Sequence, residues 1–235
     1  MKNIIKILIL VFTYQVCNSQ TNYTSKKFDV IIPYCGIEND LDELKDTLGS
    51  SYFAVYQNKD YHNWDNFQIK KYNPKQSPLP KFLIKGLKLK DNTFTTGKWI
   101  NRMFYPGESM SFTVVNIKNE ENNKSYYIYA KGKLIETKQN EFPYFSKLKD
   151  YELIVVSTRD KIKQNIRKMD IPSWSAGGFE GGVFIYWIGD INGDYKLDML
   201  IGTSSHYAFT EISLLLSNDD QKLFIEYKAG GCSSD

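Results

Sequence analysis

Residues 183–201 read Val-Phe-Ile-Tyr-Trp-Ile-Gly-Asp-Ile-Asn-Gly-Asp-Tyr-Lys-Leu-Asp-Met-Leu-Ile. Two largely apolar segments, 183–188 and 196–201, flank a short loop that is rich in Asp, Asn and Gly. Short apolar runs that end in turn-forming residues are typical of buried β-strands. This stretch therefore predicts two strands joined by a polar loop at residues 190–198, and the apolar residues 197 and 199–201 predict that the second strand is buried in a core.

The rest of the chain is also rich in strand-like segments. Most of its periodic segments alternate apolar and polar residues, and turn-forming residues separate them. The other predicted strands are residues 28–32, 51–57, 82–89, 93–100, 111–117, 125–130, 151–156, 211–216 and 223–227. Two predicted hairpins pair 82–89 with 93–100 and 111–117 with 125–130.

Two segments differ from this pattern and predict short helices. In the first, at about 40–48, Leu41, Leu44 and Leu48 recur at helical spacing. In the second, at about 159–169, Ser157 and Asp160 have the spacing of a capping box and precede a polar segment. The expected fold class is therefore mostly β or α+β, with antiparallel strands and two short helices.

The loop at 190–198 carries oxygen-bearing groups at alternate positions. Its candidate metal ligands are the side chains of Asp190, Asn192, Asp194 and Asp198 and the backbone carbonyl of Lys196. Carboxylates this close repel one another unless a cation lies between them, and oxygen ligands at this spacing suit Ca²⁺. Mg²⁺ is less suited because it keeps several waters and takes few protein ligands. The alternative is a solvated turn, since Asp, Asn and Gly favour turns without any ion.

Residues 190–202 resemble the calcium-binding loops of FG-GAP and integrin-type repeats. Those loops share the pattern Asp-x-(Asp/Asn)-x-Asp-Gly-x-x-Asp followed by three apolar residues and Gly, and Asp198 is followed here by Met-Leu-Ile-Gly. The resemblance implies a calcium-binding strand–loop–strand element within this segment. Ile201 stands at position 12, where an EF-hand loop has an acidic residue, so an ordinary EF-hand is excluded.

Two features depart from that family. Its loops usually have glycine at position 6, where this chain has Tyr195. A left-handed backbone costs a non-glycine residue about 1 kcal/mol. The family also builds propellers from many such repeats, whereas this chain carries one copy. We therefore do not expect a multi-blade propeller.

The beginning of the chain predicts export. Lys2 and Lys6 accompany a short apolar run, and small residues precede a cleavage point between Ser19 and Gln20. Residues 1–19 are thus predicted to be a signal peptide. The alternative is an N-terminal helix of the folded domain. The run is shorter than the roughly 20 residues of a transmembrane helix, and no later stretch is long enough.

A second alternative concerns Cys17, which follows the apolar run and could carry a lipid anchor at the cell surface. Cleavage after Ser19 would remove it and leave residues 20–235 as one exported β-rich domain, either periplasmic, extracellular or on the cell surface. The Pro-containing segment 74–80 is an alternative boundary within that domain.

The composition narrows the range of partners. The net charge of the whole chain is +3, and loss of Lys2 and Lys6 lowers it to +1. That balance argues against nucleic acid or an anionic membrane as a dedicated partner. The exported chain keeps Cys35 and Cys232, which an oxidising compartment would tend to join. The alternative is two free thiols.

The sequence contains no strong catalytic signature. His206 follows Gly-Thr-Ser-Ser, residues 202–205, and is a weak candidate for a general base beside a serine nucleophile. A hydrogen-bonded turn is the plainer interpretation of this cluster. Trp174 could line a platform for a carbohydrate or peptide, although core packing is the default for all four tryptophans, Trp64, Trp99, Trp174 and Trp187.

These observations favour an exported, non-enzymatic protein with one structural calcium ion that acts as a binding or cell-surface module. An extracellular protein or a carbohydrate is the expected kind of ligand. The alternative is a secreted hydrolase with its site near His206 and a calcium ion that stabilises the scaffold.

Overall fold

The computed structural model describes residues 28–33, 51–58, 66–75, 79–116, 120–136, 145–171, 182–206, 209–218 and 222–233. These residues form antiparallel strands and one short 3₁₀ helix, η1 (Glu120–Asn122), and include no α-helix. The strands of the first half are β1 (Asp29–Ile31), β2 (Phe53–Gln57), β3 (Asn66–Lys71), β4 (Phe82–Lys85), β5 (Thr93–Met103) and β6 (Ser109–Val114). Those of the second half are β7 (Lys124–Glu136), β8 (Phe145–Ser157), β9 (Lys163–Ile171), β10 (Gly182–Gly189), β11 (Asp198–His206), β12 (Phe209–Ser217) and β13 (Phe224–Ser233).

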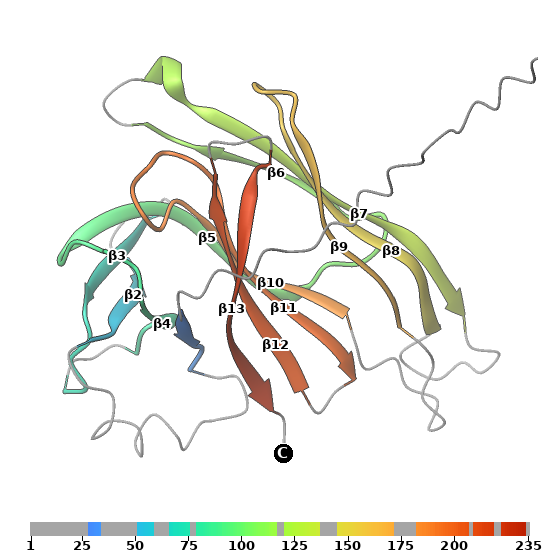
Figure 1. The fold of residues 1–235 in the computed structure, drawn as a ribbon, viewed down its shortest axis with the longest axis horizontal. Coiled ribbons are helices and arrows are strands. Elements are labelled where there is room, and N and C mark those ends of the chain that lie inside the picture. The colour runs from blue at the N-terminus through green and yellow to red at the C-terminus, as the bar shows by residue number, and fades with distance from the viewer. Residues whose placement is uncertain are drawn as a thin grey trace, which may run out of the picture.

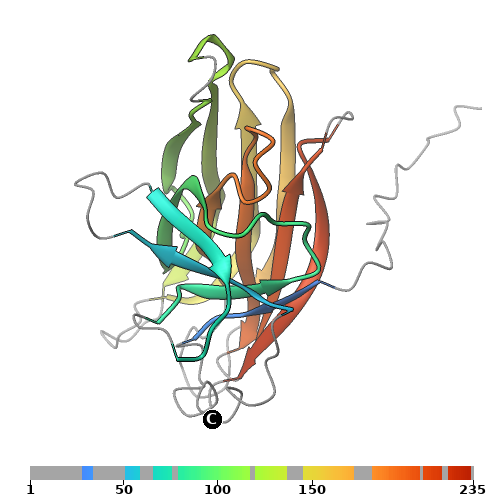
Figure 2. The same ribbon diagram turned by 90° about the vertical axis from the view of Figure 1, so that its left-hand side faces the viewer.

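Nine of these strands form one strongly curved sheet. Its order is β1-β4-β2-β3-β5-β10-β11-β12-β13, and the two end strands, β1 and β13, lie against each other. The backbone carbonyl of Val30 in β1 lies 2.7 Å from the position that a Cβ on Gly230 of β13 would occupy. The sheet is therefore nearly closed, like a barrel (Figures 1 and 2).

Strand β5 joins the two halves of this sheet. Its first residues pair with β3, and its later residues, from Gly97 onward, pair with β10 on the other side. Gly97 lies opposite Gly189, and a Cβ at Gly97 would lie 2.6 Å from the indole of Trp187. Because these two glycines have no side chains, the ring of Trp187 can pack directly against the backbone where β5 begins to pair with β10.

The remaining four strands form a separate sheet, ordered β6-β7-β8-β9. This sheet packs across the outer face of β10–β13, and the core between the two includes Ile128, Leu153, Ile185 and Ile201 (Figure 1). The inner face of β10–β13 packs against β1–β5 in a second core. Strands β10–β12 are therefore covered on both faces, which explains their nearly continuous apolar sequences.

Most predicted strands are confirmed. The four predicted in the C-terminal part correspond to β10–β13, and the hairpin of 111–117 with 125–130 is confirmed as β6 and β7. The hairpin of 82–89 with 93–100 is wrong: β4 pairs with β1 and β2, whereas β5 pairs with β3 and β10. The mostly β class is confirmed, and no propeller is formed.

The predicted helix at 159–169 is also wrong, because residues 163–171 form strand β9. One of the two capping-box hydrogen bonds does form: the Asp160 amide donates to Ser157 Oγ at 3.2 Å. The Asp160 carboxylate accepts the Ser157 hydroxyl at 2.9 Å, whereas the Ser157 amide donates to the carbonyl of Ile162. They close a turn between β8 and β9 instead of starting a helix. Lys161 then has φ 58°, which is incompatible with a right-handed helix.

Several predictions lie outside the described residues: the signal peptide at 1–19, Cys17, and the helix at about 40–48. Segment 74–80 joins β3 to β4, and both strands belong to the nine-stranded sheet. No helix in the described ranges is long and apolar enough to span a membrane.

The fold also bears on the predicted disulfide. Cys232 lies in β13 and packs against the inner core, whereas Cys35 lies outside the described residues. Val30 of β1 lies beside Gly230 of β13, so each cysteine is within five residues of this contact. Strand β1, which precedes Cys35 in the chain, therefore lies beside the strand that carries Cys232, and the disulfide itself stays a prediction.

We predict that reduction will lower the free energy of unfolding by about 4–5 kcal/mol, because the bridge would close a loop of nearly the whole domain. Intact mass after alkylation, with and without prior reduction, tests for the bond itself. Cys35→Ser and Cys232→Ser should each match the reduced protein in a denaturant titration. Two alkylated thiols in the unreduced protein would contradict the prediction.

Candidate metal loop and adjoining groove

The acidic loop connects β10 to β11 at one end of the molecule. It begins and ends in the protein interior: Asp190 is 5% exposed and Asp198 is 0% exposed, and Ile191 and Leu197 are buried beside them. The middle of the loop, residues 192–194, is exposed. The apolar side chains thus anchor both ends, and the exposed part is held between fixed points.

The carboxylate of Asp190 organises the start of the loop. Its Oδ1 accepts the amides of Gly193 at 2.7 Å and Asp194 at 3.1 Å. Its Oδ2 accepts the amide of Tyr195 at 2.9 Å. One side chain therefore turns three consecutive backbone N–H groups inward, which folds the loop around the carboxylate.

The side chains of Asn192 and Asp194 each accept one further backbone amide of the loop. Asn192 Oδ1 accepts the amide of Asp194 at 3.0 Å, and Asp194 Oδ1 accepts the amide of Lys196 at 2.9 Å. Gly193 has φ 80°, and Tyr195 has φ 61°. Position 6 of the loop is therefore left-handed, as the comparison with calcium loops implied, although it is occupied by tyrosine.

Asp198 closes the loop from within the core. Its Oδ2 accepts the amide of Ile191 at 2.9 Å, and its Oδ1 accepts the amide of Ser217 at the end of β12 at 2.7 Å. Ser217 Oγ also donates to Asp194 Oδ2 at 2.6 Å. The loop is thus tied to the end of β12 through two of its carboxylates.

The electrostatics of the buried carboxylates are unfavourable. Burial raises the pKa of Asp198 well above its usual value, and the nearby charges of Asp194 and Asp190 raise it further, against the lowering effect of the amides. Burial likewise raises the pKa of Asp190, and Asp194 adds to this effect. Among the described residues, no lysine or arginine forms an ion pair with Asp190 or Asp198. A cation beside them would relieve both desolvation and mutual repulsion.

Contacts from two other strands hold the loop in place. Tyr126 of β7 accepts the Leu197 amide on its hydroxyl oxygen at 3.3 Å, and burial raises the pKa of Tyr126 to about 12, so the phenol stays neutral. On the other side, the Asp190 amide donates to the carbonyl of Thr96 at 3.2 Å, and Thr95 Oγ1 donates to the carbonyl of Asp190. The loop therefore joins both sheets.

The donor set is chemically suited to Ca²⁺, because every candidate ligand offers oxygen and three of them are carboxylates. As the side chains stand, however, no group of three or more His, Cys, Asp or Glu in the described part of the chain is arranged to hold a metal ion. The carboxylates of Asp190 and Asp198 point to backbone amides, which hold the loop without an ion. Calcium binding therefore stays a prediction, in which the ion would bind to the lone pairs of these oxygens that the amides do not use.

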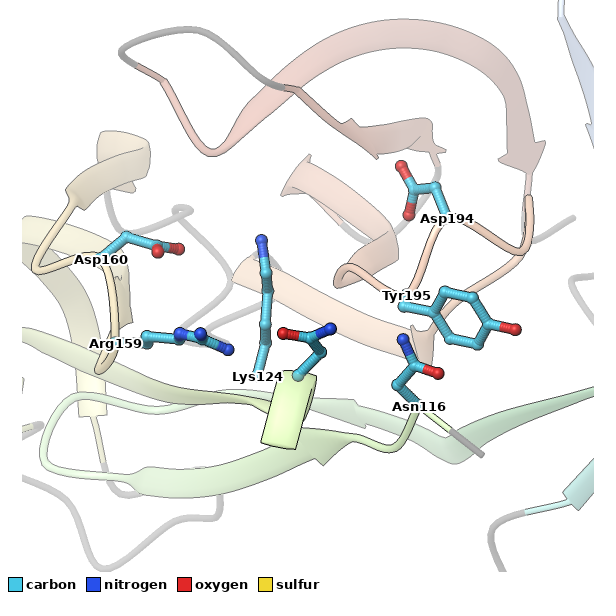
Figure 3. A pocket seen from close by; sticks show the side chains of 7 residues that line it. Asn116, Lys124, Arg159, Asp160, Asp194 and Tyr195 are labelled. Carbon is cyan, nitrogen blue, oxygen red and sulfur yellow. The ribbon is translucent and has the colours of Figure 1, made fainter. Parts of the chain in front are cut away.

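A polar groove adjoins the exposed side of the loop, between the two sheets (Figure 3). Its volume is about 330 Å³, and a second hollow of about 250 Å³ shares Lys124 and Asp160 with it. The groove is lined by Asn116, Asn122, Lys124, Arg159, Asp160, Asp194 and Tyr195. Only the last two belong to the acidic loop. The others come from the β6–β7 connection, from Lys124 at the start of β7 and from the β8–β9 connection, and sequence reasoning did not link them to the site.

The other candidate, His206, lies at the opposite end of β11 from Asp198. A nine-residue strand separates the two positions by about 25 Å or more at its usual rise per residue. Ser204 is buried, and its hydroxyl donates to the carbonyl of Phe209 at 2.9 Å. The acidic loop and the His206 region therefore do not form one site.

The prediction of core packing can be checked for two of the four tryptophans. Trp187 is fully buried in the inner core, and Trp99 packs partly against the same core, as predicted. Trp64 and Trp174 lie outside the described residues, so a platform at Trp174 stays a prediction.

Comparisons with protein-family models, with curated proteins and with solved structures found no match to this chain. The local likeness of residues 190–202 to calcium loops therefore stands on the sequence and geometry of the loop alone.

Proposed function

We propose that this protein is an exported, β-rich binding or cell-surface module whose loop at 190–198 holds one structural calcium ion. The observation that carries the proposal is the buried pair Asp190 and Asp198, which lie beside Asp194 with no cation from the described residues to neutralise them. Two buried carboxylates of like charge favour a bound cation over an empty loop.

The ion would act mainly on the scaffold. The loop contacts β5, β7 and the end of β12, so an ion at Asp190, Asp194 and Asp198 would connect the nine-stranded sheet to the four-stranded sheet. Asn192 and the carbonyl of Lys196 are the remaining candidate ligands. The export predicted from the sequence favours this function, because weak calcium sites suffice in extracellular modules.

A thermal melt in chelator and then in calcium tests the proposal. At a calcium concentration 100 times its Kd, the ion should stabilise the fold by about 2.7 kcal/mol, which raises Tm by about 5–10 °C for a domain of this size. Asp194→Asn removes one exposed carboxylate and should abolish most of this rise. Magnesium at the same concentration should have a much smaller effect.

Asp150→Asn is the matched control. Asp150 is a highly exposed aspartate, with 71% of its side chain accessible, in the four-stranded sheet. Its φ is 52°, which asparagine tolerates. This variant should keep the full rise in Tm. An unchanged melt of the wild-type protein in millimolar calcium, or an equal rise in Asp194→Asn, would contradict the proposal.

A further inference from the structure

The groove beside the acidic loop has an unusual charge arrangement. Lys124 rises from its floor between Asp160 on one side and Asp194 on the other (Figure 3). Within the described residues, its ammonium group forms no hydrogen bond and no ion pair, although the side chain is only partly exposed. A lysine held in a groove without a partner is available to an external anion.

Arg159 provides a second cation on the same side as Asp160 (Figure 3). Its Nη1 donates to the backbone carbonyl of Glu121 at 3.1 Å, which fixes the side chain beside the groove. That carbonyl is neutral, so the positive charge of the guanidinium is not cancelled by the contact. Lys124 and Arg159 together can therefore bind a carboxylate.

The remaining lining groups suit hydroxyls better than a second charge. Asn116 and Asn122 offer amide side chains, and the carboxylate of Asp160 can accept hydrogen bonds from hydroxyls. Tyr195 adds an aromatic ring at the far side of the groove, next to Asn116 (Figure 3). A volume of about 330 Å³ is at the small end of small-molecule sites.

We infer that this groove binds an acidic saccharide, with the carboxylate of a uronate residue held by Lys124 and Arg159 and its hydroxyls by the amides and Asp160. The inference rests on the proposed function in one respect: calcium would strengthen binding. Lys124, Arg159, Asp160 and Asp194 sum to no net charge. An ion at Asp194 would offset its negative charge and leave the groove positive, so calcium and the uronate would stabilise each other's binding.

Isothermal titration of the exported protein with D-glucuronate tests the inference, with D-glucose as the neutral analogue and inorganic sulfate as a simple anion. Glucuronate should bind in calcium, and glucose about 10- to 100-fold more weakly, as expected for loss of a charge-assisted contact. Lys124→Gln should weaken glucuronate binding by a similar factor. Lys133→Gln, a substitution of an exposed lysine on the same strand, should leave binding unchanged.

The outcomes separate the inference from the proposed function. A calcium-dependent rise in Tm without glucuronate binding would overturn the saccharide site and leave the calcium module intact. Glucuronate binding that is equally tight in chelator would overturn the coupling to calcium. Sulfate binding as tight as glucuronate, or full glucuronate binding by Lys124→Gln, would overturn the acidic saccharide as the ligand of this groove.

Discussion

Replacing Arg167 with methionine is expected to lower the free energy of unfolding by about 3–5 kcal/mol, the usual cost of removing one partner from a buried ion pair. The guanidinium of Arg167 in β9 forms two hydrogen bonds with the carboxylate of Glu226 in β13. The side chains are only 13% and 14% exposed, respectively. The variant would leave Glu226 charged, largely desolvated and without its partner.

The pair belongs to a network that crosses the interface between the sheets. Arg167 Nε donates to Thr203 Oγ1 in β11 at 2.8 Å, and Nη2 donates to Ser213 Oγ in β12 at 3.0 Å. Ser213 Oγ in turn donates to Glu226 Oε1 at 2.7 Å. One arginine of the four-stranded sheet therefore holds three strands of the nine-stranded sheet.

Chemical denaturation followed by circular dichroism measures the effect, and two further variants define it. Glu211→Gln breaks an ion pair with Lys228 whose side chains are 36% and 52% exposed, so it should cost less than about 1 kcal/mol. The double variant Arg167→Met with Glu226→Leu removes both charges and should recover much of the lost stability. If Arg167→Met costs no more than Glu211→Gln, the network does not stabilise the sheet interface.

This network shows what the sequence could not reveal. Arg167 and Glu226 are 59 residues apart in the chain, and each is one of many charged residues, with Arg167 in a segment that the sequence predicts to be a helix. Their pairing depends on how two sheets are stacked. No local sequence pattern around Arg167 or Glu226 indicates how the sheets are stacked.

Local patterns were informative where both faces of a strand are buried or where a turn is closed by neighbouring residues. Strands β10–β12 were predictable because their apolar runs fill two cores. The bend of the acidic loop was predictable because Asp190, Asn192 and Asp194 hydrogen-bond to amides only two to five residues ahead. The groove was not predictable, since its walls come from separate turns.

The errors in the sequence prediction also arise where contacts between distant segments decide the structure. Ser157 and Asp160 form one of the two expected local hydrogen bonds, but pairing with β8 makes the following segment a strand. Strand β4 followed the expected pattern, but its partners are β1 and β2 rather than β5, its neighbour in the sequence. Strand content depends on local polarity, whereas strand order depends on contacts between distant segments.

Replacing Trp187 with alanine is expected to destabilise the protein by about 3–5 kcal/mol, because it empties the largest side-chain volume of the inner core. The indole lies 6.1 Å from the ring of Phe67 and 5.8 Å from that of Phe82, measured between ring centroids. It also fills the space left by Gly97 and Gly189. These residues come from strands on opposite sides of the nearly closed sheet, so the cavity would lie where β5 and β10 hold its two halves together.

Trp187→Phe separates the effect of volume from that of the indole N–H. Trp187 Nε1 is buried and has no hydrogen-bond partner among the described residues, so phenylalanine removes an unsatisfied donor while it keeps much of the ring. We therefore expect this variant to lose clearly less stability than Trp187→Ala in the same denaturation experiment. Phe94→Ala, at a ring that is 62% exposed, is the surface control and should change the free energy of unfolding by less than about 0.5 kcal/mol. A cost for Trp187→Ala as small as that of Phe94→Ala would mean that this tryptophan does not join the two halves of the sheet.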